Sequence, residues 1–259
     1  MGLRPAAFPF ARIRLRPDPF PPILLRTGGG RARDGAPARI FRAPARDVEH
    51  LLYGKQGSGS AAIEAALALA HVPFRQVETA SWEMNAAYDD LLKVNPLGQV
   101  PALVLPDGTV LSESAAILIH LGLAHPASGL LPHDAAPRAH VLRGLVYLAA
   151  NCYAAIGVID YPERWTLPAD DAATNERVRA GARARLHACW TTFADLFAAG
   201  GGPFLGGAAP DALDLLAAVV SKWSGARAHL AQQRPQLHAT LLRIGAHPVV
   251  APVFARHWP

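Results

Sequence analysis

From Val48 onward, the pattern of apolar and polar positions follows the order strand, helix, strand, helix, strand, strand, helix. The predicted strands are short apolar runs at residues 50–53, 71–77, 102–105 and 109–111, and Pro106-Asp107-Gly108 joins the last two as a hairpin. Helices are predicted over residues 60–70 and 79–94 and from Glu113 onward. After residues 126–129, the segments 138–159, 175–199, 211–223 and 235–257 all show helical patterns. The chain is therefore predicted to contain a mixed part followed by an all-helical part.

The run Asn95-Pro96-Leu97-Gly98-Gln99-Val100-Pro101 ends just before the predicted hairpin. An X-Pro bond adopts the cis form at modest cost, and a cis bond at Val100-Pro101 would leave the Val100 backbone unpaired and facing outward. The helix that begins at Glu113 and Ser114 would point its first free N–H groups at an anion beside that strand. Together these features predict a binding site for an extended peptide.

The formal charge of +5 would suit a nucleic-acid-binding protein, but residues 1–46 alone hold ten arginines and two aspartates. Removing that +8 leaves the rest of the chain at −3, without a basic stripe among aromatic residues, so we expect no nucleic-acid partner. Residues 1–47 are rich in Arg, Pro and Gly and lack serine and periodicity, which predicts a disordered extension. A misassigned start codon would explain such a segment. An arm for targeting or for an anionic partner is the alternative.

The two cysteines, Cys152 and Cys189, lie far apart in apolar helical stretches without C-x-x-C spacing. We interpret both as buried thiols of a cytoplasmic protein. The eleven histidines are scattered without metal-ligand spacing, so no metal site is expected. The longest charge-free apolar run, residues 144–159, is shorter than the ~18–20 residues of a membrane span, and no membrane partner is expected.

These motifs resemble the glutathione-binding half of the glutathione S-transferase superfamily, which carries an Asn-Pro-x-Gly-x-Val-Pro run, a Pro-Asp-Gly-type hairpin and a Glu-Ser pair. Residues 51–60 look like the family's first strand and active-site loop, and residues 203–214 look like its capping motif. The resemblance implies an α+β fold, with a thioredoxin-like βαβαββα domain over residues 48–126, a linker over 127–135 and an all-helical domain over 136–259. It also implies glutathione as co-substrate and a homodimer.

The resemblance places the chemistry in the loop between the first strand and the first helix. A Ser, Tyr or Cys activates the glutathione thiol in this family, depending on class. Counting back from the helix end at His71 puts Ser58 nearest the serine-type position, whereas Gly59 falls nearest the cysteine-type position. Disulfide-forming chemistry is therefore in doubt. Ser60 is the alternative thiolate donor, although a helix N-cap would also explain it. A hydroxyl hydrogen bond and helix-terminal amides would favour the thiolate over a thiol with an ordinary pKa of roughly 8.5.

The resemblance also implies which residues contact glutathione. The Glu113 carboxylate would accept from the γ-glutamyl ammonium, while the hydroxyl and amide of Ser114 would bind the adjacent carboxylate; ordinary helix capping is the alternative for both. Val100, beside Pro101, would pair its backbone with the cysteinyl unit, and Gln99 is either an amide contact or a solvated edge residue. The family's usual basic contact to the glycyl carboxylate has no counterpart in residues 81–84.

An apolar pocket for the second substrate is expected in the helical part. Its candidate wall residues, each of which core packing would also explain, are Tyr147, Asn151, Tyr153 and Trp165. Asp211 and Asp214 have the spacing of a helix N-cap and its N3 partner, and we assign them to folding.

We therefore expect a homodimeric, cytoplasmic glutathione transferase of the detoxification type, which directs the thiolate at a hydrophobic electrophile. One alternative is a non-catalytic protein of the same fold that binds ligands or partners. Another is a glutathione-dependent isomerase or thiol reductase.

Overall fold

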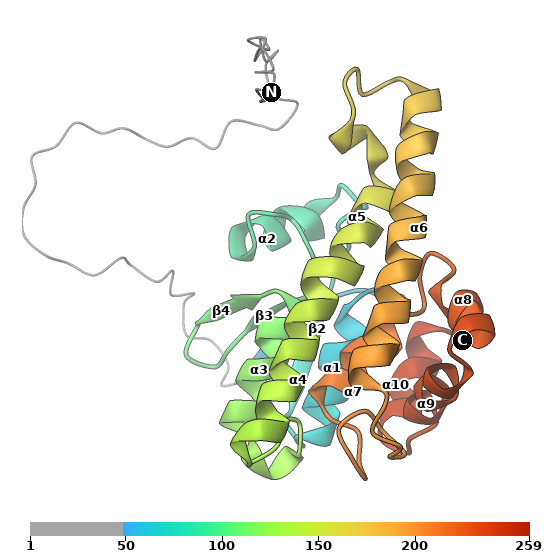
Figure 1. The fold of residues 1–259 in the computed structure, drawn as a ribbon. Coiled ribbons are helices and arrows are strands. Elements are labelled where there is room, and N and C mark those ends of the chain that lie inside the picture. The colour runs from blue at the N-terminus through green and yellow to red at the C-terminus, as the bar shows by residue number, and fades with distance from the viewer. Residues whose placement is uncertain (1–48) are drawn as a thin grey trace, which may run out of the picture. The chain divides into compact units, whose positions relative to one another are not determined.

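The computed structural model describes residues 49–259, so the expectation for residues 1–47 lies outside the described part of the chain (Figure 1). Four strands form one mixed sheet: β1 (His50–Gly54), β2 (Phe74–Glu78), β3 (Ala102–Val104) and β4 (Val110–Ser112). Their order across the sheet is β2-β1-β3-β4. β1 is parallel to β2 and antiparallel to β3, and β3 and β4 form the predicted hairpin.

Three helices accompany this sheet: α1 (Ser60–Leu69), α2 (Ala86–Val94) and α3 (Ser114–Ala124). With the strands they follow the order βαβαββα, which confirms the predicted thioredoxin-like arrangement. The predicted start of the second strand was wrong. β2 begins at Phe74 because the Val72 amide still bonds to the carbonyl of Leu67 in α1, and Pro73 has no N–H to donate.

The predicted start of the second helix was also wrong. α2 begins at Ala86 instead of residue 79, because the Asn85 side chain accepts from the Tyr88 amide at 3.1 Å and so caps the helix there. Residues 79–84 before the cap form a loop.

The remaining elements of the described chain are helical, as predicted. The elements are the 3₁₀ turns η1 (Pro126–Ser128) and η3 (Pro162–Trp165), the π-helical η2 (Leu148–Tyr153), and α4 (Ala135–Tyr147), α5 (Ala154–Asp160), α6 (Ala172–Phe197), α7 (Ala212–Val220), α8 (Ala226–Gln233), α9 (Pro235–Gly245) and α10 (Val250–His257). α4, η2 and α5 follow one another without a break, and α6 lies alongside them (Figure 1). The short and largely polar α8 was not predicted.

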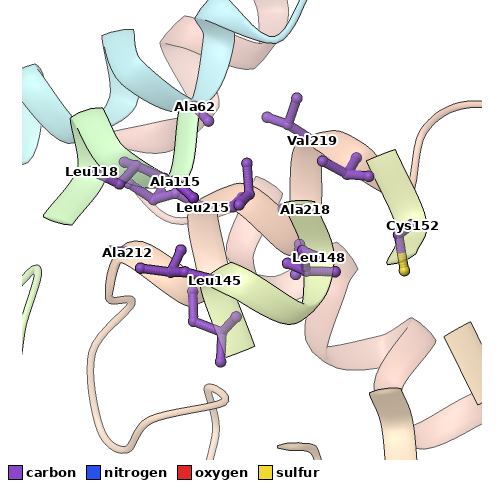
Figure 2. Packing of buried hydrophobic residues seen from close by; sticks show 14 of the residues in the cluster. Ala62, Ala115, Leu118, Leu145, Leu148, Cys152, Ala212, Leu215, Ala218 and Val219 are labelled. Carbon is purple, nitrogen blue, oxygen red and sulfur yellow. The ribbon is translucent and has the colours of Figure 1, made fainter. Parts of the chain in front are cut away.

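Helix α7 is the centre of the core, and every one of its residues is buried. Its Leu215 and Val219 lie among Ala62 of α1, Leu118 of α3 and Leu148 of η2 (Figure 2). The small side chains of α1 allow this close approach, because an alanine-rich helix can be packed on several sides at once. The core therefore runs continuously from the sheet-bearing part into the helical part.

The N-terminus of α7 is closed by reciprocal capping. Asp211 accepts from the amides of Leu213 and Asp214, at 2.8 and 3.1 Å, and Asp214 accepts from the Asp211 amide at 3.0 Å. The second Asp214 oxygen accepts from the Leu205 amide at 2.9 Å, which ties the preceding loop to the helix. Both carboxylates are buried and serve as acceptors for backbone groups, so their observed contacts are structural.

The continuous helical run Ala135–Asp160 is long and apolar enough to cross a membrane, on grounds of length and composition alone. A core helix meets the same criterion, and this run packs against α6 and α7.

Candidate functional site

The chain that enters β3 is shaped by a turn anchored on Asn95. Its buried side chain donates to the carbonyl of Gln99 at 2.8 Å and accepts from the amide of Leu97 at 3.2 Å. The Val100-Pro101 bond that follows is cis, as the sequence predicts. Val100 lies outside the strand ladder, and within residues 49–259 its backbone groups bond to no other residue. Its backbone is therefore available to an extended ligand.

The N-terminus of α3 lies beside this edge. Ala102 pairs with Ser112, so the next residues along, Pro101 and Glu113, are neighbours at the same end of the sheet. Glu113 is exposed and has a φ of 67°, a left-handed conformation that non-glycine residues seldom adopt and that clusters at ligand sites. In the described part of the chain, neither the Glu113 carboxylate nor the buried Ser114 hydroxyl is hydrogen-bonded. Both groups are therefore uncommitted where helix amides attract an anion.

The loop from β1 to α1 leaves the sheet at this same end, because Tyr53 pairs with Ala102. The buried Ser58 Oγ accepts from the amides of Lys55 and Ser60, both at 3.3 Å, and lies 2.9 Å from Ser60 Oγ. The Ser60 hydroxyl donates to the Lys55 carbonyl at 3.4 Å. The two serines thus form a hydrogen-bonded network beside the N-terminus of α1, where an anion is favoured.

One interpretation of Ser60, as the N-cap of the first helix, was wrong. Gly59 holds the cap position, and Ser60 is the first residue of α1. The Ser60 side chain is fully buried against Gly54 at the end of β1, where any Cβ would overlap it. Ser60 therefore packs the loop onto the strand.

Tyr153 is one of the expected pocket-wall residues. It belongs to the helical part of the chain, and its hydroxyl lies beside Gly59 in this loop. A Cβ on Gly59 would overlap the Tyr153 hydroxyl oxygen and would lie 3.4 Å from Cδ of Pro101. The loop, the edge before β3 and Tyr153 therefore meet at one place.

The other expected wall residues are Tyr147, Asn151 and Trp165. Tyr147 donates its hydroxyl to the carbonyl of Cys189 in α6 at 2.9 Å, and its ring packs against Phe193 and Phe197. That hydroxyl is therefore committed to the helical core, and the pocket role of Tyr147 stays a prediction. Asn151 donates to the Tyr147 carbonyl at 3.1 Å, and Trp165 is 66% exposed on η3.

The β1–α1 loop is held by a residue from the last helix, which the sequence did not indicate. The buried His257 of α10 accepts from the Gly57 amide through Nδ1 at 3.1 Å, so its Nε2 carries the hydrogen and donates to Glu64 of α1 at 2.8 Å. Burial disfavours the Glu64 carboxylate, but the hydrogen bonds from His257 and Arg256 outweigh it and hold the pKa of Glu64 below its usual value. No sequence signal joins residues almost two hundred positions apart.

Lys55 is a second residue that the sequence did not indicate for the site. The loop before α2 has no basic side chain of its own, and the Lys55 ammonium reaches that loop. This ammonium contacts Glu83 in that loop and lies 3.9 Å from Glu78 of β2. The loop before α2 therefore does have a cation beside it. That cation belongs to the β1–α1 loop and is paired with two carboxylates.

The cysteines do not contribute to this site as reactive groups. Both are free and buried, and burial raises the pKa of Cys152 far above its usual value. Within residues 49–259, no group of three or more His, Cys, Asp or Glu side chains is arranged to hold a metal ion.

Comparison with known proteins gives one family match and several similar sequences and solved structures. Residues 60–123 match the family described as the N-terminal domain of glutathione S-transferases. An uncharacterized GST-like protein of Escherichia coli K12, YncG, is 38% identical over 115 residues, which are 44% of this chain and 56% of that protein. The chain thus spans little more than half the length of this curated relative.

Solved structures match over a longer range. A glutathione transferase homologue from Sulfitobacter, solved with bound glutathione, is 27% identical with a TM-score of 0.68, covering 80% of this chain and 97% of that one. A glutathione S-transferase from Xanthobacter autotrophicus is 32% identical with a TM-score of 0.60, covering 77% and 94%.

Proposed function

Because the chain belongs to the glutathione S-transferase superfamily, we propose that it is a glutathione transferase that activates the glutathione thiol for attack on a hydrophobic electrophile. One observation carries this proposal. The unpaired backbone of Val100, the uncommitted Glu113 and Ser114, and the Ser58 loop all lie at the same end of the sheet. They match the successive parts of a γ-glutamyl-cysteinyl peptide.

In this proposal the peptide lies along the chain before β3. Its cysteinyl backbone pairs with Val100 beside Pro101, as an added strand pairs with a sheet edge. Its γ-glutamyl end reaches α3, where Glu113 binds the ammonium and the Ser114 hydroxyl and amide bind the carboxylate. Gln99, which is exposed, is a further polar contact.

The sulfur then lies at the N-terminus of α1, within reach of the Ser58 hydroxyl. The thiol loses its proton to solvent, Ser58 donates a hydrogen bond to the thiolate, and the sulfur electron pair forms the new bond to the electrophile. A hydrogen bond to a charged group contributes about 1.5–3 kcal/mol, which lowers the thiol pKa by about one to two units. Ser60 is the alternative donor.

The electrophile is proposed to be apolar, bound against the helical part, and the protein to act as a cytoplasmic homodimer. One observation favours the non-catalytic alternative. Lys55 is paired with Glu83 and Glu78, so the glycyl carboxylate of glutathione would meet a cation that is already neutralised.

Two measurements separate the enzyme from the binder. The first is retention on immobilised glutathione with elution by free glutathione. The second is conjugation of glutathione to 1-chloro-2,4-dinitrobenzene, followed by absorbance. An active transferase is retained and turns over, and Ser58→Ala keeps retention while losing most of the rate. Retention without turnover of several different electrophiles would favour the binder, and absence of retention would refute glutathione binding.

A further inference from the structure

The Tyr153 hydroxyl lies beside the N-terminus of α1, next to the place where the sulfur of a bound glutathione is expected, although Tyr153 comes from the helical part of the chain. A Cβ on Gly59 would overlap the Tyr153 hydroxyl oxygen, while the ring carbon Cζ would lie at an ordinary 3.5 Å and Cδ of Pro101 at 3.4 Å. The hydroxyl therefore fills the volume that a side chain at residue 59 would otherwise take, between the N-terminus of α1 and the edge before β3.

The backbone that carries Tyr153 is shaped for this position. Tyr153 is the last residue of the π-helical segment η2, which interrupts the α-helical run from α4 to α5. A π-helical turn displaces the following side chains around the helix axis and is frequent at functional sites. The Tyr153 ring also packs against Trp223, with centroids 5.6 Å apart, which restrains the ring that carries the hydroxyl.

The Tyr153 hydroxyl has no hydrogen-bond partner within residues 49–259. This contrasts with Ser58, whose oxygen is engaged by two amides and by Ser60. An uncommitted hydroxyl beside a ligand site is a donor that a ligand can use, because pairing it removes the cost of leaving a polar group unsatisfied.

We propose that Tyr153 is a catalytic residue that donates its hydroxyl hydrogen to the glutathione thiolate, across Gly59, from the helical part of the chain. This inference rests on the proposed function and adds a second hydroxyl to the sulfur site. Gly59 is then required because any larger residue would displace the donor.

The protonation state of Tyr153 suits a donor and not a base. Burial first, and then the negative charges of Glu113 and Asp160, raise the pKa of Tyr153 to about 12. The phenol keeps its proton throughout the reaction. The thiol proton leaves to solvent, the sulfur electron pair forms the bond to the electrophile, and Tyr153 stabilises the sulfur charge until that bond is made.

The first test compares Tyr153→Phe with Tyr161→Phe, which removes a phenol from a ring stacked on Arg164. The thiolate absorbance of bound glutathione is titrated against pH in both variants and in wild type. Tyr153→Phe is expected to raise the pKa of the bound thiol by about one to two units and to lower the rate roughly 10- to 100-fold near neutral pH. Tyr161→Phe is expected to match wild type. Glutathione affinity at low pH, where the thiol is neutral, should be equal in all three.

The second test needs no activity. Gly59→Ala is expected to lower the melting temperature by roughly 2–10 °C, because the added methyl overlaps the Tyr153 hydroxyl. Tyr153→Phe should restore most of that loss in the double variant, because the ring carbon alone leaves the methyl an ordinary contact. A double variant that melts no higher than Gly59→Ala would contradict the placement of the hydroxyl.

The outcomes separate this inference from the proposed function. If wild type does not bind glutathione, the proposed function fails, whatever the melting experiment shows. If wild type turns over and Tyr153→Phe leaves the thiol titration unchanged, while Ser58→Ala shifts it, the inference on Tyr153 is overturned and the transferase remains. If both substitutions shift the titration, the sulfur has two hydroxyl donors, as proposed.

Discussion

The hydrogen bonds that hold the β1–α1 loop can be tested by Glu64→Gln, which keeps the shape of the side chain and removes its charge. The Glu64 carboxylate accepts from His257 Nε2 at 2.8 Å and from Arg256 at 2.9 Å. Because Gly57 donates to Nδ1 of His257, the ring must present an N–H to residue 64. Glutamine has one acceptor oxygen, so its NH₂ group would face one of these two donors.

The size of the effect follows from the burial of each partner. Both Glu64 and His257 are almost fully buried, and a buried hydrogen bond to a charged group contributes about 1.5–3 kcal/mol. The side chain of Arg256 is 60% exposed, so its bond adds less than about 1 kcal/mol. We expect Glu64→Gln to lose about 1.5–3 kcal/mol of stability, or roughly 3–12 °C in melting temperature for a protein of this size.

The pH dependence of this loss has a definite sign. The folded-state pKa of Glu64 lies below its ordinary value of 4.5, so its contribution is fully present above that value and is lost as pH falls through the folded-state pKa. The difference in melting temperature between wild type and Glu64→Gln should therefore be constant near neutral pH and shrink in acid.

Thermal unfolding followed by circular dichroism measures both quantities, with Glu176→Gln as the matched control. Glu176 also pairs with an arginine, at 2.6 Å from Arg179, but it is 63% exposed and should contribute less than about 1 kcal/mol. If Glu64→Gln melts with wild type at pH 7, or if its deficit grows in acid, the reasoning about this buried network is refuted.

Three further substitutions test separate parts of the structure. Glu113→Ala should weaken glutathione binding by about 1.5–3 kcal/mol in calorimetry without changing the melting temperature, and unchanged affinity would make Glu113 only a helix-end charge. Gly206→Ala should prevent folding or lower the melting temperature steeply, because its Cβ would overlap the buried Oδ2 of Asp211; a normal circular dichroism melt would contradict this. Tyr147→Phe should cost about 0.5–1.5 kcal/mol in denaturant unfolding through loss of the bond to Cys189, and a loss well above that range would assign Tyr147 a further role.

The sequence predicts those features that depend on neighbouring residues. The order of strands and helices follows from local periodicity, and the cis bond at Val100-Pro101 agrees with the expectation from the run at residues 95–101, which resembles the family's motif. The capping of α7 follows from two aspartates three positions apart. Each of these patterns is complete within a few residues, so no knowledge of the rest of the fold is needed.

The features that the sequence could not predict depend on packing between distant segments. His257 meets Gly57 and Glu64, and Lys55 meets Glu83, only after the chain has folded. The left-handed backbone at Glu113 has no local signal either, because glutamate does not favour it. Periodicity places Tyr153 on a helix, but the π-helical turn that determines its direction cannot be read from composition.

The enclosure of α1 bears on how the molecule folds and how it can be divided. α1 packs against α3 of its own half and against α7 and α10 of the other, and its residues from Ser60 to Leu67 are all buried. A fragment that stopped before α4 would expose this alanine-rich surface and leave the Glu64 carboxylate without its partners, at a cost that a short chain cannot offset. We therefore expect the two halves to unfold together, in a single transition.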